Sequence, residues 1–374
     1  MRRFWKAVSV LAGMIIGAGM FAIPFAFTQT GFWLGASQLA LLAGITLLLH
    51  LLYGEIVLAT PAFHRMPGYM RIYLGRGAEI VSWASSLFGI AGTLLAYLVI
   101  GSLFSQSAIA AIIPGADIFW IALLLTCAVA FITFFPLKKE AGINGVLTIF
   151  EIAFIAAVSL LLMPKISLTH LAGFHPGNLF VPYGVLLFAL SGASVIPDLV
   201  TVLGRDKKKV RAAIVAGSLI PVVLYFLFAL AVVGVTGSAT SEEAISGLAG
   251  AVGGRMVLLA SVAGFLAVLT SFIALSANFQ AMLSLDLGMR RRVSWLAAST
   301  LPFVLYLAGF QNFIATISAV GVLAFGIDAI LFLLVGLRMR KGRPSRGGIP
   351  LFLIYAVFLI IAGGVLVQLV RMVW

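Results

Sequence analysis

The chain has 374 residues, of which 63% are hydrophobic and only 9% are charged, with a formal net charge of +13. A soluble globular protein carries charge at about a quarter of its positions, so this composition excludes a soluble globule and predicts a protein of the lipid bilayer. The basic residues lie in short groups between apolar segments, which argues against a nucleic-acid partner. The single cysteine, Cys127, excludes a disulfide framework and a thiolate metal site.

Eleven apolar stretches are long enough to cross the roughly 30 Å hydrocarbon core of a membrane. We therefore expect an all-α polytopic membrane protein with eleven transmembrane helices in a single domain over residues 1–374. The first stretch lacks the small-residue cleavage site of a signal peptide, so it is expected to remain as a helix. The stretches cover residues 7–29, 33–59, 80–112, 118–136, 143–163, 179–203, 211–236, 255–284, 294–309, 312–337 and 349–371.

The distribution of Lys and Arg over the loops predicts the orientation. Of the 24 basic residues, 21 fall on the same side as the N-terminus, and only Lys165, Arg255 and Arg371 fall on the other. Cytoplasmic loops carry the excess of Lys and Arg, so we expect a cytoplasmic N-terminus and an external C-terminus in the plasma (inner) membrane.

The first apolar segment is interrupted near its middle by Gly17-Ala18-Gly19 and, five residues later, by Pro24. A helix that breaks at this depth frees backbone polar groups that hydrocarbon cannot satisfy. Such breaks are tolerated where they are buried in protein or line a polar cavity, as in the discontinuous helices of secondary transporters. The segment therefore predicts a binding site.

A similar interruption recurs five helices later. Gly192-Ala193-Ser194 is followed by Val-Ile-Pro, much as the first break is followed by Met-Phe-Ala-Ile-Pro. An odd number of spans per repeat inverts the second copy, so residues 7–163 and 179–337 are expected to form a 5+5 inverted repeat, with 349–371 as an extra helix. The alternative is that these small residues only allow close helix packing.

Several motifs resemble those of known transporters. GMIIGAGMFAIP (13–24) resembles the helix 1 motif of the amino acid–polyamine–organocation superfamily, and residues 203–235 resemble the helix 6–7 region of the hydroxy/aromatic amino acid permeases. LLYGE (51–55) and LTSF (269–272) resemble helix 2 and helix 8 motifs of that family. The resemblance implies the leucine-transporter fold and proton-coupled amino acid uptake. Residues 191–194 stand where the aromatic permeases have a Phe-His-containing segment. The resemblance therefore does not determine whether the substrate has an aromatic side chain.

An amino acid would find complementary groups at the two breaks. Its carboxylate suits the N–H groups and the positive dipole end of the outer half of helix 1, while its ammonium suits carbonyls at Met14–Ile16 and Phe188–Leu190. Tyr97 of helix 3 is either a pocket residue or a packing residue. The candidate substrate-binding residues are Ile16, Gly17, Ala18, Gly19, Met20, Tyr97, Phe188, Ser191, Gly192, Ala193 and Ser194.

Four carboxylates, Glu55, Glu151, Asp198 and Asp328, lie inside spans, and no Lys or Arg lies deep in a span to pair with them. A buried glutamate favours its neutral form, so Glu151, the ionisable residue of helix 5, is the candidate proton carrier and Glu55 is the next. Glu55 is alternatively a hydrogen-bond acceptor for the unwound segments. Asp198 suits a helix N-terminus, and Asp328 an inner gate.

Sodium coupling is the alternative. In sodium-coupled relatives the spacing Ala267, Thr270, Ser271 supplies one carbonyl and two hydroxyls, completed by helix 1 carbonyls that here would be Gly13 and Ile16. These hydroxyls would otherwise bond within their own helix. A channel or a membrane enzyme fits less well, because nothing resembles a catalytic cluster or a ring of like residues. We expect no enzyme activity and no cofactor beyond a coupling ion, H⁺ or Na⁺. The expected partners are an amino acid and the bilayer.

Overall fold

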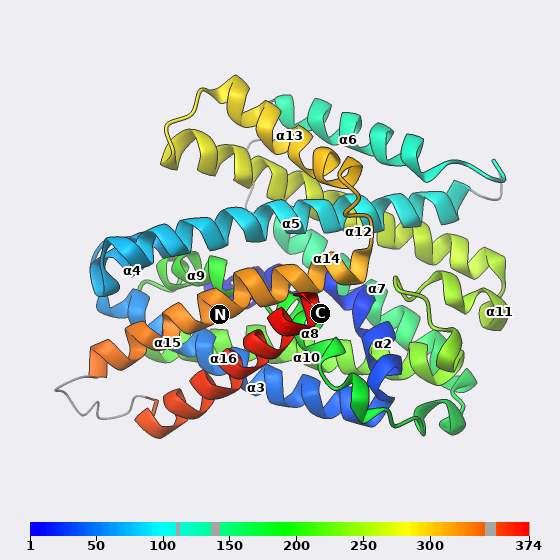
Figure 1. Cartoon of the computed structure of the whole chain (residues 1–374), viewed down its shortest axis with the longest axis horizontal. Coiled ribbons are helices and arrows are strands. Elements are labelled where there is room, and N and C mark those ends of the chain that lie inside the picture. Colours follow the sequence, from blue (N-terminus) through cyan, green and yellow to red (C-terminus); the bar gives the residue numbers. More distant parts are fainter. Residues whose placement is uncertain (110–112, 136–142, 341–348, 374) are drawn as a thin grey trace.

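The structure is a computed structural model that describes residues 1–109, 113–135, 143–340 and 349–373. This part of the chain is helical, and its long helices run roughly side by side (Figure 1). Helices satisfy their own backbone hydrogen bonds, as a bilayer requires. The α-helices are α1 (Arg2–Ile15), α2 (Gly19–Thr30), α3 (Phe32–Ala59), α4 (Met66–Leu74), α5 (Arg76–Ile109), α6 (Ile118–Phe134), α7 (Ile143–Leu162), α8 (Val181–Ala189), α9 (Ile196–Val202), α10 (Lys207–Thr236), α11 (Ala249–Val252), α12 (Gly254–Ala281), α13 (Arg291–Leu307), α14 (Phe313–Val320), α15 (Gly326–Arg340) and α16 (Leu351–Val373).

Fewer helices pass a test for membrane spans than the sequence predicts. Among the described residues, eight spans are long and apolar enough, or nine if the bent pair α1 and α2 is one span. The expected spans 118–136 and 294–309 correspond to α6 and α13, which have 17 residues each. The count of eleven therefore stays a prediction, as does the inverted repeat. Of the basic residues that predict the orientation, Lys138, Lys139, Lys341, Arg343 and Arg346 lie outside the described residues.

Two helices are interrupted where the sequence places glycines. α1 and α2 meet at an angle of 54° across residues 16–18, where Ile16 has an extended backbone. α8 ends at Ala189, and a 3₁₀ turn over Ala193–Val195 leads into α9. Pro197 lies in the first turn of α9, a position that tolerates a missing N–H. Each break leaves backbone groups without their usual helical partners.

Glycines allow the half-helices to pack tightly. A side chain at Gly217 of α10 would meet Leu11 of α1, since an ideal Cβ would lie 2.9 Å from the Leu11 Cβ. At Gly321, in a π-helical turn over Gly321–Phe325, a Cβ would overlap the Gly184 carbonyl of α8. Such approaches give dispersion contact in an environment where lipid removes the hydrophobic driving force between helices.

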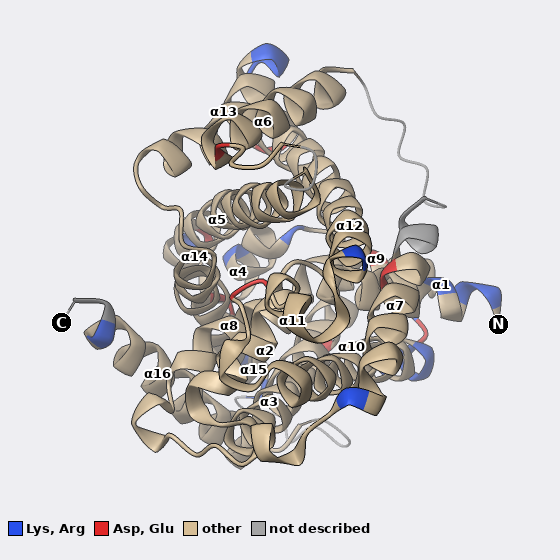
Figure 2. Ribbon diagram, turned by 90° about the vertical axis from the view of Figure 1, so that its right-hand side faces the viewer, with Lys and Arg blue, Asp and Glu red and all other residues tan. Residues whose placement is uncertain are grey.

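The remaining helices lie around this centre. Figure 2, viewed along the long helices, places α6 and α13 together at one edge and α16 at another. α16 is tied to α8, because the Tyr183 hydroxyl donates to the Ile361 carbonyl at 3.1 Å and the Arg371 guanidinium lies 5.5 Å from the centroid of the Phe180 ring. The last helix therefore supports the half-helix that precedes the second break.

Candidate substrate site

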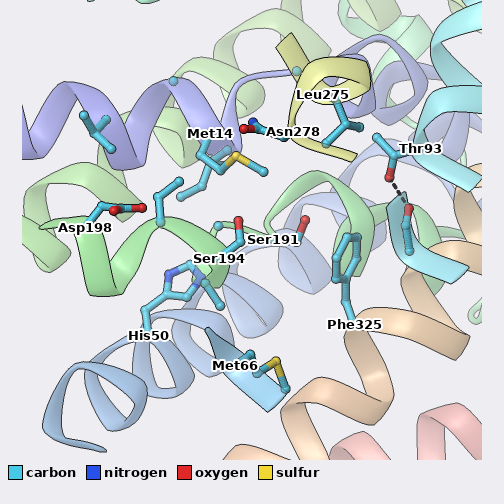
Figure 3. Close-up of a pocket in the computed structure, with 18 of the residues that line it drawn as sticks. Met14, His50, Met66, Thr93, Ser191, Ser194, Asp198, Leu275, Asn278 and Phe325 are labelled. Atoms are coloured by element: carbon cyan, nitrogen blue, oxygen red, sulfur yellow. Dashed lines mark hydrogen bonds between the residues drawn. The ribbon is translucent and has the colours of Figure 1, made fainter. Parts of the chain in front are cut away.

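A cavity of about 1420 Å³ leads from one side of the molecule to both helix breaks. Its mouth lies beside the N-terminus, where Arg2, Lys6, His64 and Arg65 line it. In Figure 3, Met14, Ser191, Ser194, Asn278 and Phe325 surround the same space. The cavity exceeds the few hundred cubic ångströms that a small ligand needs, because it joins the candidate site to an open vestibule.

Aromatic side chains lie on the far side of the helix 1 break. Phe21 of α2 makes edge contacts with Phe104 of α5 and Phe228 of α10, with ring centroids 4.8 and 6.2 Å apart. All three side chains are buried. Among the described residues, the two breaks are therefore reached by a cavity from the side of the N-terminus, and buried aromatic rings pack on the opposite side.

The residues of the helix 1 break lie on the cavity wall. Ile16, Gly17, Ala18 and Gly19 line the large cavity, and Met20 lines a second, small cavity beside it. The N–H groups of Met20 and Phe21 donate to the Gly17 and Ala18 carbonyls, both at 3.2 Å. Because those two amides are used within the turn, the amides of Ala18 and Gly19 are the candidates for a carboxylate.

The helix 6 break faces the same cavity from another side. Its five predicted residues all line the wall: Phe188, Ser191, Gly192, Ala193 and Ser194. The Ser191 hydroxyl donates to the Phe188 carbonyl at 2.8 Å, so it is held by its own turn. Gly192 has a packing reason as well, since an ideal Cβ there would lie 2.6 Å from Ile15 Cγ1. The glycine lets α1 approach the break, a contact that the sequence did not predict.

A further face of the cavity comes from α5, which corresponds to the third expected span, residues 80–112. Tyr97 lines the wall, and an ideal Cβ at Gly17 would lie 3.3 Å from the Tyr97 hydroxyl oxygen. One turn away, the Thr93 hydroxyl donates to the Gly89 carbonyl at 2.6 Å, as the dashed line in Figure 3 shows. The Thr93 hydroxyl is therefore satisfied within its own helix. The Tyr97 hydroxyl, in contrast, lies close to the helix 1 break.

Several wall residues escaped the sequence reasoning, and three of them illustrate why. Leu275 and Asn278 come from α12, and Phe325 ends the π-helical turn that precedes α15. The Phe325 ring lies 6.0 Å from the Phe188 ring, centroid to centroid. A π-helical turn is set by tertiary packing, so no local sequence signal marks Phe325 as a cavity residue.

Glu151 of α7 is buried yet touches both cavities. Glu151 lines the large cavity and the small one, which has a volume of about 10 Å³. Ser271 of α12 lies close to the side chains of both Glu151 and Tyr97. Glu151, Ser271 and Tyr97 thus form one polar cluster next to the helix 1 break.

The expected sodium ligands are divided in the structure. Ile16 and Ala267 line the small cavity, together with Gly17 and Glu151. The Thr270 hydroxyl, however, donates to the Ala267 carbonyl at 2.9 Å within its own helix. Gly13 lines the large cavity instead, where a Cβ would overlap the Thr148 side chain.

Glu55 corrects one expectation from the sequence. The Arg340 guanidinium lies 2.7 Å from the Glu55 carboxylate, and the Arg340 side chain is only 6% exposed. Arg340 belongs to the basic group that follows the span 312–337, but α15 extends the helix to this residue and brings it into the bundle. The expectation that no basic side chain reaches the intramembrane carboxylates is therefore wrong for Glu55.

The two aspartates lie on the cavity wall. Asp328 accepts a hydrogen bond from the Ser85 hydroxyl at 2.5 Å, and this hydroxyl also lies 3.0 Å from the Ala324 carbonyl. Asp198 lies in the first turn of α9, the position expected for an acidic residue at a helix N-terminus. Arg205, which follows α9, donates to the Val57 and Thr60 carbonyls at the end of α3, at 2.9 and 2.7 Å.

Tyr225 of α10 is a site residue that the sequence did not reveal. It lies within an apolar run, where aromatic residues usually only pack, and its side chain is fully buried. Its hydroxyl lies 2.6 Å from the Ile15 carbonyl and 3.2 Å from the Ala189 carbonyl. Both carbonyls end a half-helix, so one hydroxyl contacts both breaks.

The chain is similar to known proteins in fold and in sequence. The fold is similar to that of MhsT, whose crystal structure is in complex with L-phenylalanine, with a TM-score of 0.67, 15% sequence identity and coverage of 98% of this chain and 97% of that one. This likeness gives the leucine-transporter fold. Glutamine transporter 2 of Aliivibrio fischeri (strain ATCC 700601 / ES114) is 23% identical over 291 residues, which is 73% of each protein.

The whole chain also matches one family of transporters. The model of the tryptophan/tyrosine permease family covers residues 1–371. Together with the two broken helices around one cavity, this match makes the protein an integral membrane transporter of amino acids and not an enzyme. The chain belongs to the tryptophan/tyrosine permease family.

Proposed function

We propose that this transporter is a proton-coupled symporter that carries a neutral or aromatic amino acid by alternating access. The observation that carries the proposal is the position of Glu151, which lines the small cavity beside Ile16, Gly17 and Ala267 and also reaches the large cavity. A carboxyl group at this point can take up and release a proton next to the substrate site. The cavity mouth beside the basic N-terminal segment supports a cytoplasm-facing state with the N-terminus inside.

The breaks support an amino acid as the substrate. The amides of Ala18 and Gly19 suit its carboxylate, and carbonyls freed at the two breaks suit its ammonium. Phe188, Leu275 and Phe325 offer an apolar face for its side chain. The family, the glutamine transporter and the MhsT complex together suggest L-tryptophan, L-tyrosine, L-phenylalanine and L-glutamine as the first substrates to test.

Sodium coupling is the second candidate. Ile16 and Ala267 line the same small cavity, so their carbonyls could serve a cation there. The bond from Thr270 to the Ala267 carbonyl favours the proton, because it holds the Thr270 hydroxyl within its own helix, and Thr270 does not line the small cavity.

Reconstitution into proteoliposomes tests both coupling ions. Each of the four labelled amino acids is offered under an imposed proton gradient, a sodium gradient or neither, with wild type, Glu151→Gln and Glu79→Gln. Glu79 is a matched control, because it pairs with Arg71 at 3.4 Å outside the cavity. One proton that moves down about 100 mV provides roughly 2.3 kcal/mol, which supports about 50-fold accumulation of a neutral solute.

Under proton coupling, Glu151→Gln keeps amino acid exchange but loses uptake driven by the proton gradient, while Glu79→Gln behaves as wild type. If Glu151→Gln still concentrates substrate in response to that gradient, the coupling role passes to Glu55. Accumulation that follows only the sodium gradient would support the sodium symporter instead.

A further inference from the structure

Tyr225 connects the two helix breaks through a single hydroxyl group. The hydroxyl oxygen lies 2.6 Å from the carbonyl of Ile15, the last residue of α1, and 3.2 Å from the carbonyl of Ala189, the last residue of α8. The Gly17 backbone lies close to the same oxygen. Three backbone groups of the two breaks therefore meet at one side chain of α10.

The two carbonyls are the negative ends of their half-helices. Converging dipole ends of this kind repel each other unless a donor or a cation lies between them. A tyrosine hydroxyl has one hydrogen to donate, so at any moment it bonds one of the two carbonyls. The shorter distance shows that in this structure the donor favours Ile15, which fixes the inner half of helix 1 to α10.

We propose that Tyr225 is a positioning residue of the transport cycle: its hydroxyl pins the end of α1 and sets the spacing of the two helix breaks. This role for Tyr225 rests on the proposed amino acid transport.

The position of Tyr225 also reduces the number of carbonyl groups that could bind the substrate ammonium. The Ile15 and Ala189 carbonyls already face this hydroxyl, and the Phe188 carbonyl accepts from the N–H and hydroxyl of Ser191. Of the six carbonyls expected to suit the ammonium, those of Met14, Ile16 and Leu190 then remain.

The structure offers a matched control for the test. Tyr183 of α8 is also buried, and its hydroxyl also donates to a carbonyl of another helix, that of Ile361 at 3.1 Å. It does not contact the break residues through this bond. Tyr225→Phe and Tyr183→Phe therefore remove the same chemical group from two buried interhelical bonds.

The first measurement is amino acid exchange in proteoliposomes with whichever of L-tryptophan, L-tyrosine, L-phenylalanine and L-glutamine the wild type exchanges. We expect Tyr225→Phe to raise the KM roughly ten-fold with a maximal rate within about two-fold of wild type, because a loosened site binds substrate less well in its ground state. We expect the KM of Tyr183→Phe to stay at the wild-type value. A purely structural role would lower the maximal rate and leave the KM unchanged.

The second measurement does not depend on transport. Spin labels at Lys6→Cys on α1 and Arg76→Cys on α5, two exposed positions, report the spread of distances between these helices by double electron–electron resonance, with Cys127 replaced by Ser. The distribution should broaden with Tyr225→Phe and stay unchanged with Tyr183→Phe.

Each outcome decides the role of Tyr225. Equal distance distributions in the two variants would overturn this role. A Tyr225→Phe protein that does not fold, while Tyr183→Phe does, would also overturn it, because the hydroxyl would then be needed for folding. A KM that does not rise in Tyr225→Phe would also overturn it. If the wild type exchanges none of the four amino acids but the distribution broadens, the proposed function fails and the pinning of α1 stands.

Discussion

Arg340 and Glu55 form an ion pair between α15 and α3 in which the two partners differ in burial. The atoms are 2.7 Å apart, and the side chains are 6% exposed for Arg340 and 37% exposed for Glu55. The Arg340 guanidinium also donates to the Gly336 carbonyl at 3.1 Å. The pair joins α15, which follows the π-helical turn, to α3, which follows α2.

This asymmetry predicts unequal effects of the two single substitutions. Glu55→Ala leaves a buried guanidinium without its counter-charge, which should cost about 3 kcal/mol. Arg340→Met leaves a carboxylate that is already 37% exposed, so it should cost less, about 1 kcal/mol. Thermal unfolding in detergent of the two variants and the double variant measures both costs and their coupling. Equal costs that add in the double variant would contradict the burial argument.

A methyl group at Gly17 should weaken substrate binding without disturbing the fold. An ideal Cβ there lies 3.3 Å from the Tyr97 hydroxyl, in the gap between helix 1 and helix 3, where the carboxylate is expected. We expect Gly17→Ala to lower amino acid affinity roughly ten-fold, or about 1.4 kcal/mol, as measured by ligand-induced thermal shift.

Gly44→Ala is the matched control for this substitution, since its Cβ would meet nothing within 4 Å. Wild-type affinity in a folded Gly17→Ala protein would remove the break from the binding site. Gly19 is a poorer test, because a Cβ at Gly19 would lie 2.8 Å from the Ala189 Cα and would push α2 away from α8.

Adjacent hydroxyls of α12 should respond differently to removal. Thr270 bonds within its own helix, whereas Ser271 is a neighbour of Glu151 and Tyr97. Under proton coupling, Ser271→Ala should reduce uptake driven by a proton gradient several-fold, and Thr270→Val should leave it near the wild-type level. Loss of sodium-driven uptake in both variants would support a sodium site built from both hydroxyls.

Cysteine labelling should confirm the orientation. With Cys127 replaced by Ser, a membrane-impermeant maleimide added to intact cells should label Lys165→Cys but should label Lys208→Cys only after permeabilisation. Both lysines are exposed, so access to the reagent depends on the side of the membrane. The reverse pattern would invert the proposed topology and place the cavity mouth outside.

The sequence alone determined the features that depend on local chemistry. The membrane class follows from long apolar runs, since each helix must satisfy its own backbone in lipid. The interruption at Gly17–Gly19 was predictable because glycine tolerates irregular backbone and leaves room for a ligand. The predicted residues of the helix 1 break, 16–20, and the five predicted residues of the helix 6 break all line a cavity. Their role in substrate binding stays a prediction.

The tertiary structure decided the features that join distant segments. Tyr225 resembles any packing aromatic until its hydroxyl is placed between Ile15 and Ala189, which are 210 and 36 residues away along the chain. The sequence suggested that Arg340 lies in a loop, whereas in the structure α15 extends to Arg340 and places it next to Glu55. Composition and periodicity report which face of a helix avoids water or lipid, but a hydrogen bond or ion pair between two helices depends on their relative position and rotation, which only packing sets.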